Sequence, residues 1–249
     1  MKNVIRASFH KMFHDKAFWV SLAGTAGWSV FIGMALTWIA DAKLDVTDVS
    51  VVEKYWRDFL GFYVVSIPLL VSSTVLFTSE FKDKSWKLLV ARGISKTKIY
   101  FAKMLCMLLL STLITFVAIL TGAIYSVAAL GVPMSVAYAV SVLKYFALQA
   151  IAHGTAAVFV LSVYHLIKAS EVSSSLNMIL LVFGTMALSK IEDALSLGDA
   201  LTGCWAFAQH ACVSFVGPSD WIHVVVTFAA YLIVCSLAVI VLTSRGDVE

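Results

Sequence analysis

Charge and proline are scarce in this chain. Of its 249 residues, 13% are Asp, Glu, Lys or Arg, and 3 are proline. Soluble domains carry about 25% charged residues, so the composition excludes an ordinary soluble enzyme or nucleic-acid-binding domain. Hydrophobic residues make up 61% of the chain instead, which is typical of integral membrane proteins.

The short motifs of common ATPases and membrane enzymes are also absent. No Gly-Lys dipeptide occurs, so the chain lacks the phosphate-binding loop of an ATPase. It has neither the His-Glu-x-x-His motif of zinc proteases nor a Gly-x-Ser-x-Gly nucleophile turn. His210 and His223 flank Cys212, but their spacing is not that of zinc ligands. We therefore predict that the chain is no enzyme and holds no metal.

Long apolar runs dominate the sequence. A helix needs about 20 apolar residues to cross the hydrocarbon core of a bilayer. The sequence predicts an all-α integral membrane domain, residues 1–249, with six transmembrane helices: Ala17–Ala40, Phe59–Ser79, Ile99–Ala129, Tyr145–Ile167, Val172–Ser189 and Ile222–Thr243. The glycine and proline at Gly131 and Pro133 are expected to end the third run. Pro68 is expected to kink the second.

The distribution of Lys and Arg predicts that both termini are cytoplasmic. With this orientation, 13 of the 18 Lys and Arg lie in inner segments, as the positive-inside rule requires. A cleavable secretory signal is the alternative for the start of the chain. Its apolar region would run only 7–15 residues, which is shorter than the run at Ala17–Ala40.

Residues 1–16 have the pattern of an amphipathic helix. Their apolar side chains fall at i, i+4, i+7 and i+8, on one helical face, and are Ile5, Phe9, Met12 and Phe13. Lys, Arg and His occupy the other face. The pattern predicts an interfacial helix with its apolar face in the membrane lipid. The alternative is a basic leader that only sets the topology.

A second patterned segment, residues 80–98, joins the second and third runs. Trp86, Leu89 and Val90 are spaced as an apolar helical stripe and predict a short helix at Ser85–Ala91. Asp83 or Ser85 can cap its start. Exposed apolar residues rimmed by charge indicate a docking surface. The alternative is a positive-inside loop whose Trp lies at the lipid headgroups.

The end of this segment predicts a tight turn into the next helix. Gly93 suits the end of the short helix, and Ser95 can cap the following one. Ile94 and Ile99 stand at the staple positions around that cap.

This helix-turn-helix resembles the loop after the second span in membrane subunits of type-2 ABC (ATP-binding cassette) exporters. The matching residues are Glu80, the helix Ser85–Ala91, the turn Gly93, Ile94, Ser95, Lys96, and Ile99 with Lys103. Where the family usually has Gly-Thr before the helix, this chain has Lys84 and Ser85. The resemblance implies an ATPase-coupling site formed by Glu80, Ser85, Trp86, Leu88, Leu89, Val90, Arg92 and Gly93.

The family organisation extends over the whole chain at low resolution. It implies short re-entrant helices in the last outer segment, residues 190–221, and a location in the bacterial cytoplasmic membrane. It also implies two copies of an ATP-binding subunit that carries ATP and magnesium, and a second permease chain, identical or paralogous. Small permeases of this kind serve the export of antimicrobial peptides.

Weakly polar residues predict the transport path, namely Phe62, Tyr63, Ser66, Ser73 and Asn177. Such a lining suits an amphipathic or lipid-like substrate. The alternative function is an autonomous carrier or channel, but the predicted spans lack the carboxylates on which ion coupling usually depends.

Three histidines lie within predicted spans and are read as packed polar groups: His153, His165 and His223. Cys204 and Cys212 share the last outer segment, where they can form a disulfide or remain thiols. Gly24, Gly27 and Gly33 let helices approach the first span closely, within the chain or between two copies.

Overall fold

A computed structural model describes residues 2–40, 49–61, 63–82, 85–167, 170–198, 200–215 and 220–245. In this part of the chain every regular element is helical, which confirms the all-α prediction. The elements are α1 (Lys2–His14), α2 (Lys16–Ala40), α3 (Val49–Gly61), α4 (Ser66–Lys82), α5 (Ser85–Ala91), α6 (Lys96–Leu130), α7 (Val136–Ile167), α8 (Ser170–Ile179), a π-helical turn (Leu180–Gly184), α9 (Thr185–Leu195), two 3-10 turns (Thr202–Cys204 and Gln209–Cys212) and α10 (Trp221–Arg245).

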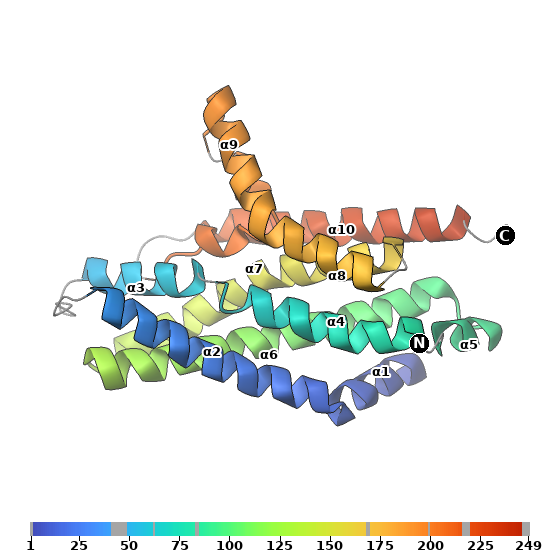
Figure 1. Ribbon diagram of the computed structural model, residues 1–249, viewed down its shortest axis with the longest axis horizontal. Helices are drawn as coiled ribbons and strands as arrows, with labels where there is room; N and C mark the ends of the chain where they lie inside the picture. Colours follow the sequence, from blue (N-terminus) through green and yellow to red (C-terminus); the bar gives the residue numbers. More distant parts are fainter. Residues whose placement is uncertain are drawn as a thin grey trace.

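The long helices form a bundle whose axes follow the long dimension of the molecule (Figure 1). Helices α6 and α7 lie side by side, with α10 packed on α7 and α2 packed on α6. Helix α1, α5 and the C-terminal end of α10 gather at one end of the bundle, which we call the terminal end. Helix α3 lies at the opposite end, which we call the α3 end.

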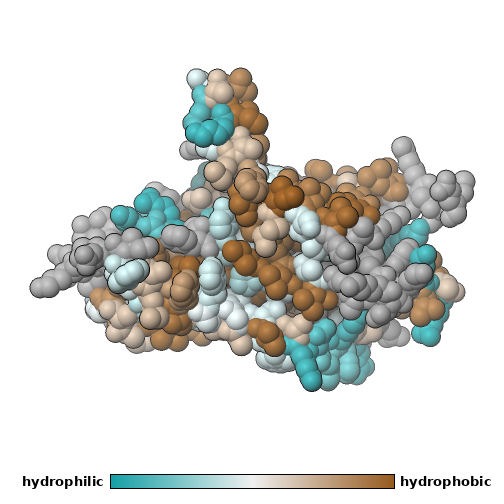
Figure 2. All heavy atoms as spheres, in the orientation of Figure 1, coloured by the Kyte–Doolittle hydropathy of each residue, from teal (hydrophilic) through white to brown (hydrophobic). Residues whose placement is uncertain are grey.

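Hydrophobic and hydrophilic side chains are separated along the bundle. Figure 2 shows hydrophobic residues over the middle of the visible face, and hydrophilic ones over α3, near α5, at the α1–α2 junction and at the tip of α9. A bilayer imposes this order, because charged side chains are costly within hydrocarbon and cheap at its borders.

Five helical segments of the described chain are long and apolar enough to cross a membrane. They are α2, α6, α7, the run through α8 and α9, and α10. Each coincides with a predicted run, although α7 begins at Val136, earlier than predicted. The remaining predicted span corresponds to α4, which has 17 residues, the lower limit of spanning length. The count of six therefore stays a prediction.

The predicted second run, Phe59–Ser79, is wrong as a single helix. Phe59 belongs to α3, which ends at Gly61, and α4 begins only at Ser66. Between them Tyr63 adopts the left-handed conformation, with φ of 56°. The sequence did not predict this break because Phe59 and Leu60 are apolar. They are buried against the bundle, and apolar residues of this kind look the same in sequence as residues of a membrane span.

The predicted kink at Pro68 is also wrong. Pro68 is the third residue of α4, and the first turn of a helix does not need the missing proline N–H. The flanking Ile67 and Leu69 N–H groups donate to the carbonyls of Tyr63 and Val65, at 3.1 and 3.0 Å. The proline therefore begins the helix without bending it.

Helix α6 has the predicted capping residues at both ends. The Ser95 hydroxyl accepts from the Lys98 N–H at 3.4 Å, and Gly131 ends the helix in the left-handed conformation at φ 72°. The helix has 35 residues and is about 52 Å long. Since a bilayer core is about 30 Å thick, α6 extends beyond the hydrocarbon.

The fifth predicted span continues past its expected end at Ser189. A π-helical turn, Leu180–Gly184, joins α8 to α9, which stands away from the bundle (Figure 1). The Glu192 carboxylate near the end of α9 accepts hydrogen bonds from the Leu201 N–H at 2.5 Å and the Thr202 N–H at 2.7 Å. These bonds fold the 200–215 segment back toward the bundle.

The glycines of α2 differ in their surroundings. A Cβ at Gly33 would lie 2.9 Å from Cδ1 of Tyr125 on α6, whereas none of the atoms around Gly24 or Gly27 comes within 4 Å of such a Cβ. Gly33 therefore serves packing within the chain.

We expect Gly33→Val to destabilise the protein by about 1–3 kcal/mol, as overpacked sites do. The added atoms displace Tyr125 and its hydrogen bond of 2.9 Å with the Thr37 hydroxyl. Thermal unfolding in detergent, followed by tryptophan fluorescence, measures the effect. Gly24→Val is the matched control, and an equal loss in both variants would contradict the packing role of Gly33.

Candidate functional site

The predicted coupling segment lies at the terminal end of the bundle. Helix α5 spans Ser85–Ala91, as the sequence predicts, and contacts α4 (Figure 1). Gly93 has a φ of 80°, and the Ile94 N–H donates to the Leu89 carbonyl at 3.1 Å. This left-handed turn leads directly into the Ser95 cap of α6.

The side chains of α5 divide into an exposed and a half-buried group. Leu88 is 62% exposed, and Arg92 and Gly93 are exposed as well, whereas Leu89 and Val90 are half-buried. The side chains of Glu80, Ser85 and Trp86 lie outside the described residues, as does Asp83. Among the described side chains of this helix, Leu88 is thus the large apolar group presented to solvent.

The N-terminal helix exists as predicted, but its apolar face is not wholly available to lipid. Helix α1 contacts α6 and α2. Met12 is buried in the protein core, and Ile5 and Phe9 are half-buried. Phe13 is the most exposed of the four, at 39%. The prediction of an entirely membrane-embedded apolar face is therefore wrong at Met12.

The residues predicted to line a transport path do not meet in one place. Ser66 and Ser73 are both buried on α4, but they are about 10 Å apart along the helix axis. Tyr63 lies in the turn before α4, and Asn177 is buried on α8. Phe62 lies outside the described residues.

Hydroxyl groups connect α4 to its neighbours α7 and α8. The Tyr164 hydroxyl of α7 lies 2.7 Å from that of Thr74 on α4 and 2.7 Å from that of Ser174 on α8. The Asn177 amide, by contrast, has no hydrogen-bond partner for its nitrogen or its oxygen within the described chain. A buried unpaired amide is costly. The Asn177 side chain therefore keeps hydrogen-bonding groups that no described residue uses.

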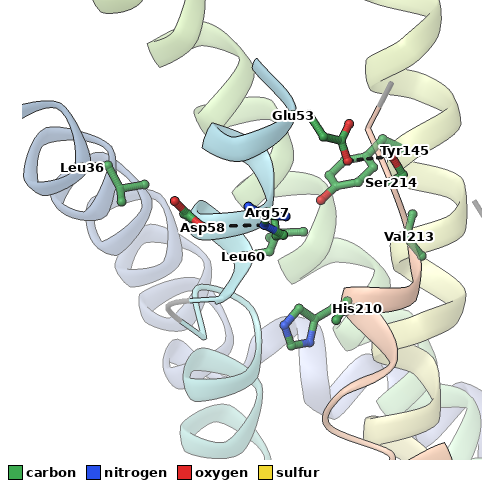
Figure 3. Close-up of a pocket in the computed structure, with 10 residues that line it drawn as sticks. Leu36, Glu53, Arg57, Asp58, Leu60, Tyr145, His210, Val213 and Ser214 are labelled. Carbon is green, nitrogen blue, oxygen red and sulfur yellow. Dashed lines mark hydrogen bonds and ion pairs between the residues drawn. The ribbon is translucent and has the colours of Figure 1, made fainter. Parts of the chain in front are cut away.

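A cavity that the sequence did not predict lies at the α3 end. Its volume is about 720 Å³, and side chains from α2, α3, α7 and the 200–215 segment line it (Figure 3). The lining residues are Leu36, Glu53, Arg57, Asp58, Leu60, Tyr145, His210, Ala211, Val213 and Ser214. Glu53, Arg57 and Asp58 all lie on α3, and Arg57 and Asp58 form an ion pair of 3.9 Å. No local sequence pattern could have shown that His210 lines the same cavity.

Glu53 ties α3 to the distant 200–215 segment. One carboxylate oxygen accepts from the Ser214 hydroxyl at 2.6 Å and from the Phe215 N–H at 3.1 Å. Hydrogen bonds to an ionised carboxylate are shorter and stronger than neutral ones. This link therefore closes one wall of the cavity, between segments that are far apart in the sequence (Figure 3).

Aromatic rings support the same wall. Phe215 stacks on Trp56 with ring centroids 4.9 Å apart and meets the edge of Tyr145 at 5.3 Å. Trp56 is fully buried.

Burial raises the pKa of Tyr55 above its ordinary value, and the neighbouring Tyr138 adds to this effect. Tyr55 therefore stays a neutral hydrogen-bond donor, with the Gly122 carbonyl 3.5 Å away.

His210 presents a hydrogen-bond acceptor at the cavity. Its Nδ1 lies 3.0 Å from the Phe207 carbonyl, which cannot donate, so Nδ1 carries the proton and Nε2 the lone pair. Burial lowers the pKa of His210, although the Phe207 carbonyl acts in the opposite direction. The Gln149 amide donates to the His210 carbonyl at 3.0 Å and holds the residue in place.

The remaining predicted groups take structural positions. Ring nitrogens of the three histidines contact backbone carbonyls, His153 with Gln149, His165 with Leu161 and His223 with Gly203. No disulfide joins Cys204 to Cys212 in the described chain. Among the described residues, no three His, Cys, Asp or Glu side chains gather as metal ligands would.

The sequence matches the family model described as ABC-2 family transporter protein over residues 4–187. The chain belongs to the ABC-2 transporter family. The match runs from α1 into α9 and includes α5, while the 200–215 segment and α10 lie beyond it. Searches of curated proteins and of solved structures found no match.

As an ABC-2 transporter protein, the chain is a type-2 ABC permease and a multi-pass membrane protein. Permeases of the family normally work with an ATP-binding subunit. This finding agrees with the absence of a phosphate-binding loop from the chain itself.

We expect Glu53→Ala to lower the free energy of unfolding of this ABC-2 permease by about 1.5–3 kcal/mol, because it leaves two donors without their charged acceptor. Amide hydrogen exchange at Phe215 should accelerate. In a double-mutant cycle, Glu53→Ala and Ser214→Ala should be less than additive, because they break one shared contact.

The control for this link is Asp58→Ala on the same helix. Asp58 makes only a 3.9 Å ion pair with the exposed Arg57, and such surface pairs are worth about 0–1 kcal/mol. Additive effects of Glu53→Ala and Ser214→Ala would show that the link contributes no coupling.

Proposed function

We propose that this permease is the membrane half of an ATP-driven exporter. Two copies of an ATP-binding subunit carry ATP and magnesium, and a second permease chain, identical or paralogous, completes the transport path. The assembly resides in the bacterial cytoplasmic membrane and moves an amphipathic substrate, such as an antimicrobial peptide, a drug or a lipid-like molecule, out of the cell.

The observation that carries the proposal is the form of α5. It is a separate short helix at the terminal end, placed in the chain between α4 and α6. The Gly93 turn and the Ser95 cap form a short connection from α5 to α6. A force applied to α5 by a docked subunit is therefore transmitted to α6.

The exposed Leu88 supplies the apolar contact for such docking. A large apolar side chain at 62% exposure, with the exposed Lys87 and Arg92 next to it and four positions on in the sequence, has the character of an interface anchor. The excess of Lys and Arg around α5 supports a cytoplasmic position for the terminal end, where an ATP-binding subunit is available.

An autonomous ion-coupled carrier is the weaker candidate. Such carriers place ionisable groups along the membrane path. Glu192 is buried near the end of the α8–α9 run, but its carboxylate accepts two backbone N–H groups and the Thr202 hydroxyl at 2.9 Å. These bonds commit it to the fold of the 200–215 segment.

Co-purification from membranes in mild detergent tests the docking surface. We expect the wild type to retain an ATP-binding subunit and Leu88→Asp to retain at least ten-fold less, because a charge in a desolvated anchor position costs about 2 kcal/mol or more. ATP hydrolysis and retained subunit are measured in the same eluate.

Leu197→Asp is the matched control, since Leu197 is also exposed and follows α9. It should retain the subunit fully. An ATP-binding subunit that remains with Leu88→Asp would place docking elsewhere on the permease. Absence of the subunit from the wild type would favour the autonomous carrier.

A further inference from the structure

We propose that α9 is a contact surface for a second copy of this permease, in which Lys190 of each copy meets Asp193 of the other. The proposal rests on the proposed function for the presence of a second permease chain. It identifies that chain as a copy of this one and names residues through which the two meet. Its structural argument is independent of ATP coupling.

Helix α9 lies apart from the long helices of the bundle. Figure 1 shows it leaving the bundle after the π-helical turn, steeply inclined to the long helices. Its contacts are with that turn and with the turn Thr202–Cys204. The Trp205 ring covers the start of α9, because a Cβ at Gly184 would lie 2.9 Å from its Cζ2 atom. Beyond this point the helix projects from the molecule.

One face of α9 is occupied by the chain itself. Thr185, Leu188 and Glu192 fall at i, i+3 and i+7, on one side of the helix. Glu192 is buried, and Thr185 and Leu188 are half-buried. The Glu192 carboxylate accepts the backbone N–H groups of Leu201 and Thr202. This face therefore holds the 200–215 segment and is not available to another molecule.

A different face of α9 carries an exposed stripe. Met186, Lys190 and Asp193 fall at i, i+4 and i+7. Met186 is 63% exposed, and the side chains of Lys190 and Asp193 are 85% and 71% exposed. Ser196 ends the helix in the left-handed conformation, so the stripe does not continue to Leu197.

Neither lipid nor water suits the whole stripe. Charged side chains such as Lys190 and Asp193 are costly against hydrocarbon. Met186, and Phe183 in the preceding turn, expose large apolar side chains, which gain free energy when they leave water. A protein surface that offers apolar contacts together with one charge of each sign suits all four residues.

A second copy of α9 has this composition in the required order. Two permease chains with the same orientation in a membrane are related by a two-fold axis along the bundle. In such an interface, residue i contacts residue j of the other copy and j contacts i. If the two α9 helices cross between positions 190 and 193, each Lys190 lies against an Asp193, and the two ion pairs have opposite directions. The stripe is thus complementary in charge to itself.

The ion pair within α9 leaves both charges available for this contact. Lys190 Nζ and the Asp193 carboxylate are 3.8 Å apart, and both side chains are largely exposed. Exposed pairs of this kind contribute little to stability. Exchanging this partner for the one on the second copy therefore costs little.

The test is co-purification of two differently tagged copies of the full permease, expressed together and extracted in mild detergent. We expect the wild-type copies to co-purify. When both copies carry Lys190→Asp, or both carry Asp193→Lys, recovery of the second tag should fall at least five-fold, because like charges then face each other across the interface.

The decisive sample pairs a copy that carries Lys190→Asp with a copy that carries Asp193→Lys. Every contact between these copies joins opposite charges again, whereas the two positions within each α9 have like charges. We expect recovery within two-fold of the wild type. Such a recovery cannot arise from the ion pair within α9, and its absence would overturn the proposal.

Leu195→Asp is the matched control, because it adds a charge to α9 at an exposed position outside the stripe. It should leave co-purification unchanged. Failure of the wild-type copies to co-purify, or no effect of the two single variants, would also overturn the proposal and leave the stripe to a paralogue or to lipid. Retention of the ATP-binding subunit is measured separately with Leu88→Asp, so the proposed function can stand when this contact fails.

Discussion

The hydrocarbon core of the bilayer is the constraint on which the rest of this structure depends. Within it, backbone groups must be paired inside helices and charged side chains are expensive. In the part of the chain that the structure describes, long apolar helices form the bundle, and hydrophilic side chains gather at its two ends and at the tip of α9. The two candidate sites are divided in the same way, with the proposed docking helix α5 at the terminal end and a polar cavity at the α3 end.

The two ends are built by different physical means. At the terminal end, local signals suffice, because a glycine at φ 80° and a serine cap position α5 against α6. At the α3 end, the structure depends on long-range contacts, in which Glu53 holds Ser214 and Phe215 while Phe215 stacks on Trp56. Helices α6 and α7 extend between the two ends (Figure 1).

This division explains what the sequence could predict. Helix Ser85–Ala91, the Ser95 cap and the Gly131 stop follow from residues within a few positions of one another, and the structure confirms them. The break between α3 and α4 was missed because buried residues such as Phe59 read as part of a span. The cavity was missed because it joins Glu53 to residues more than 150 positions away, and periodicity carries no information about such contacts.

The central claim is that α5 faces the cytoplasm and the cavity faces the opposite side. In a background with all four cysteines replaced by serine, Arg92→Cys and Arg57→Cys place single exposed thiols at the two ends. A membrane-impermeant maleimide should modify Arg57→Cys in intact cells and Arg92→Cys only after permeabilisation. Labelling of Arg92→Cys in intact cells, with Arg57→Cys protected, would place α5 away from any cytoplasmic ATPase and contradict the account.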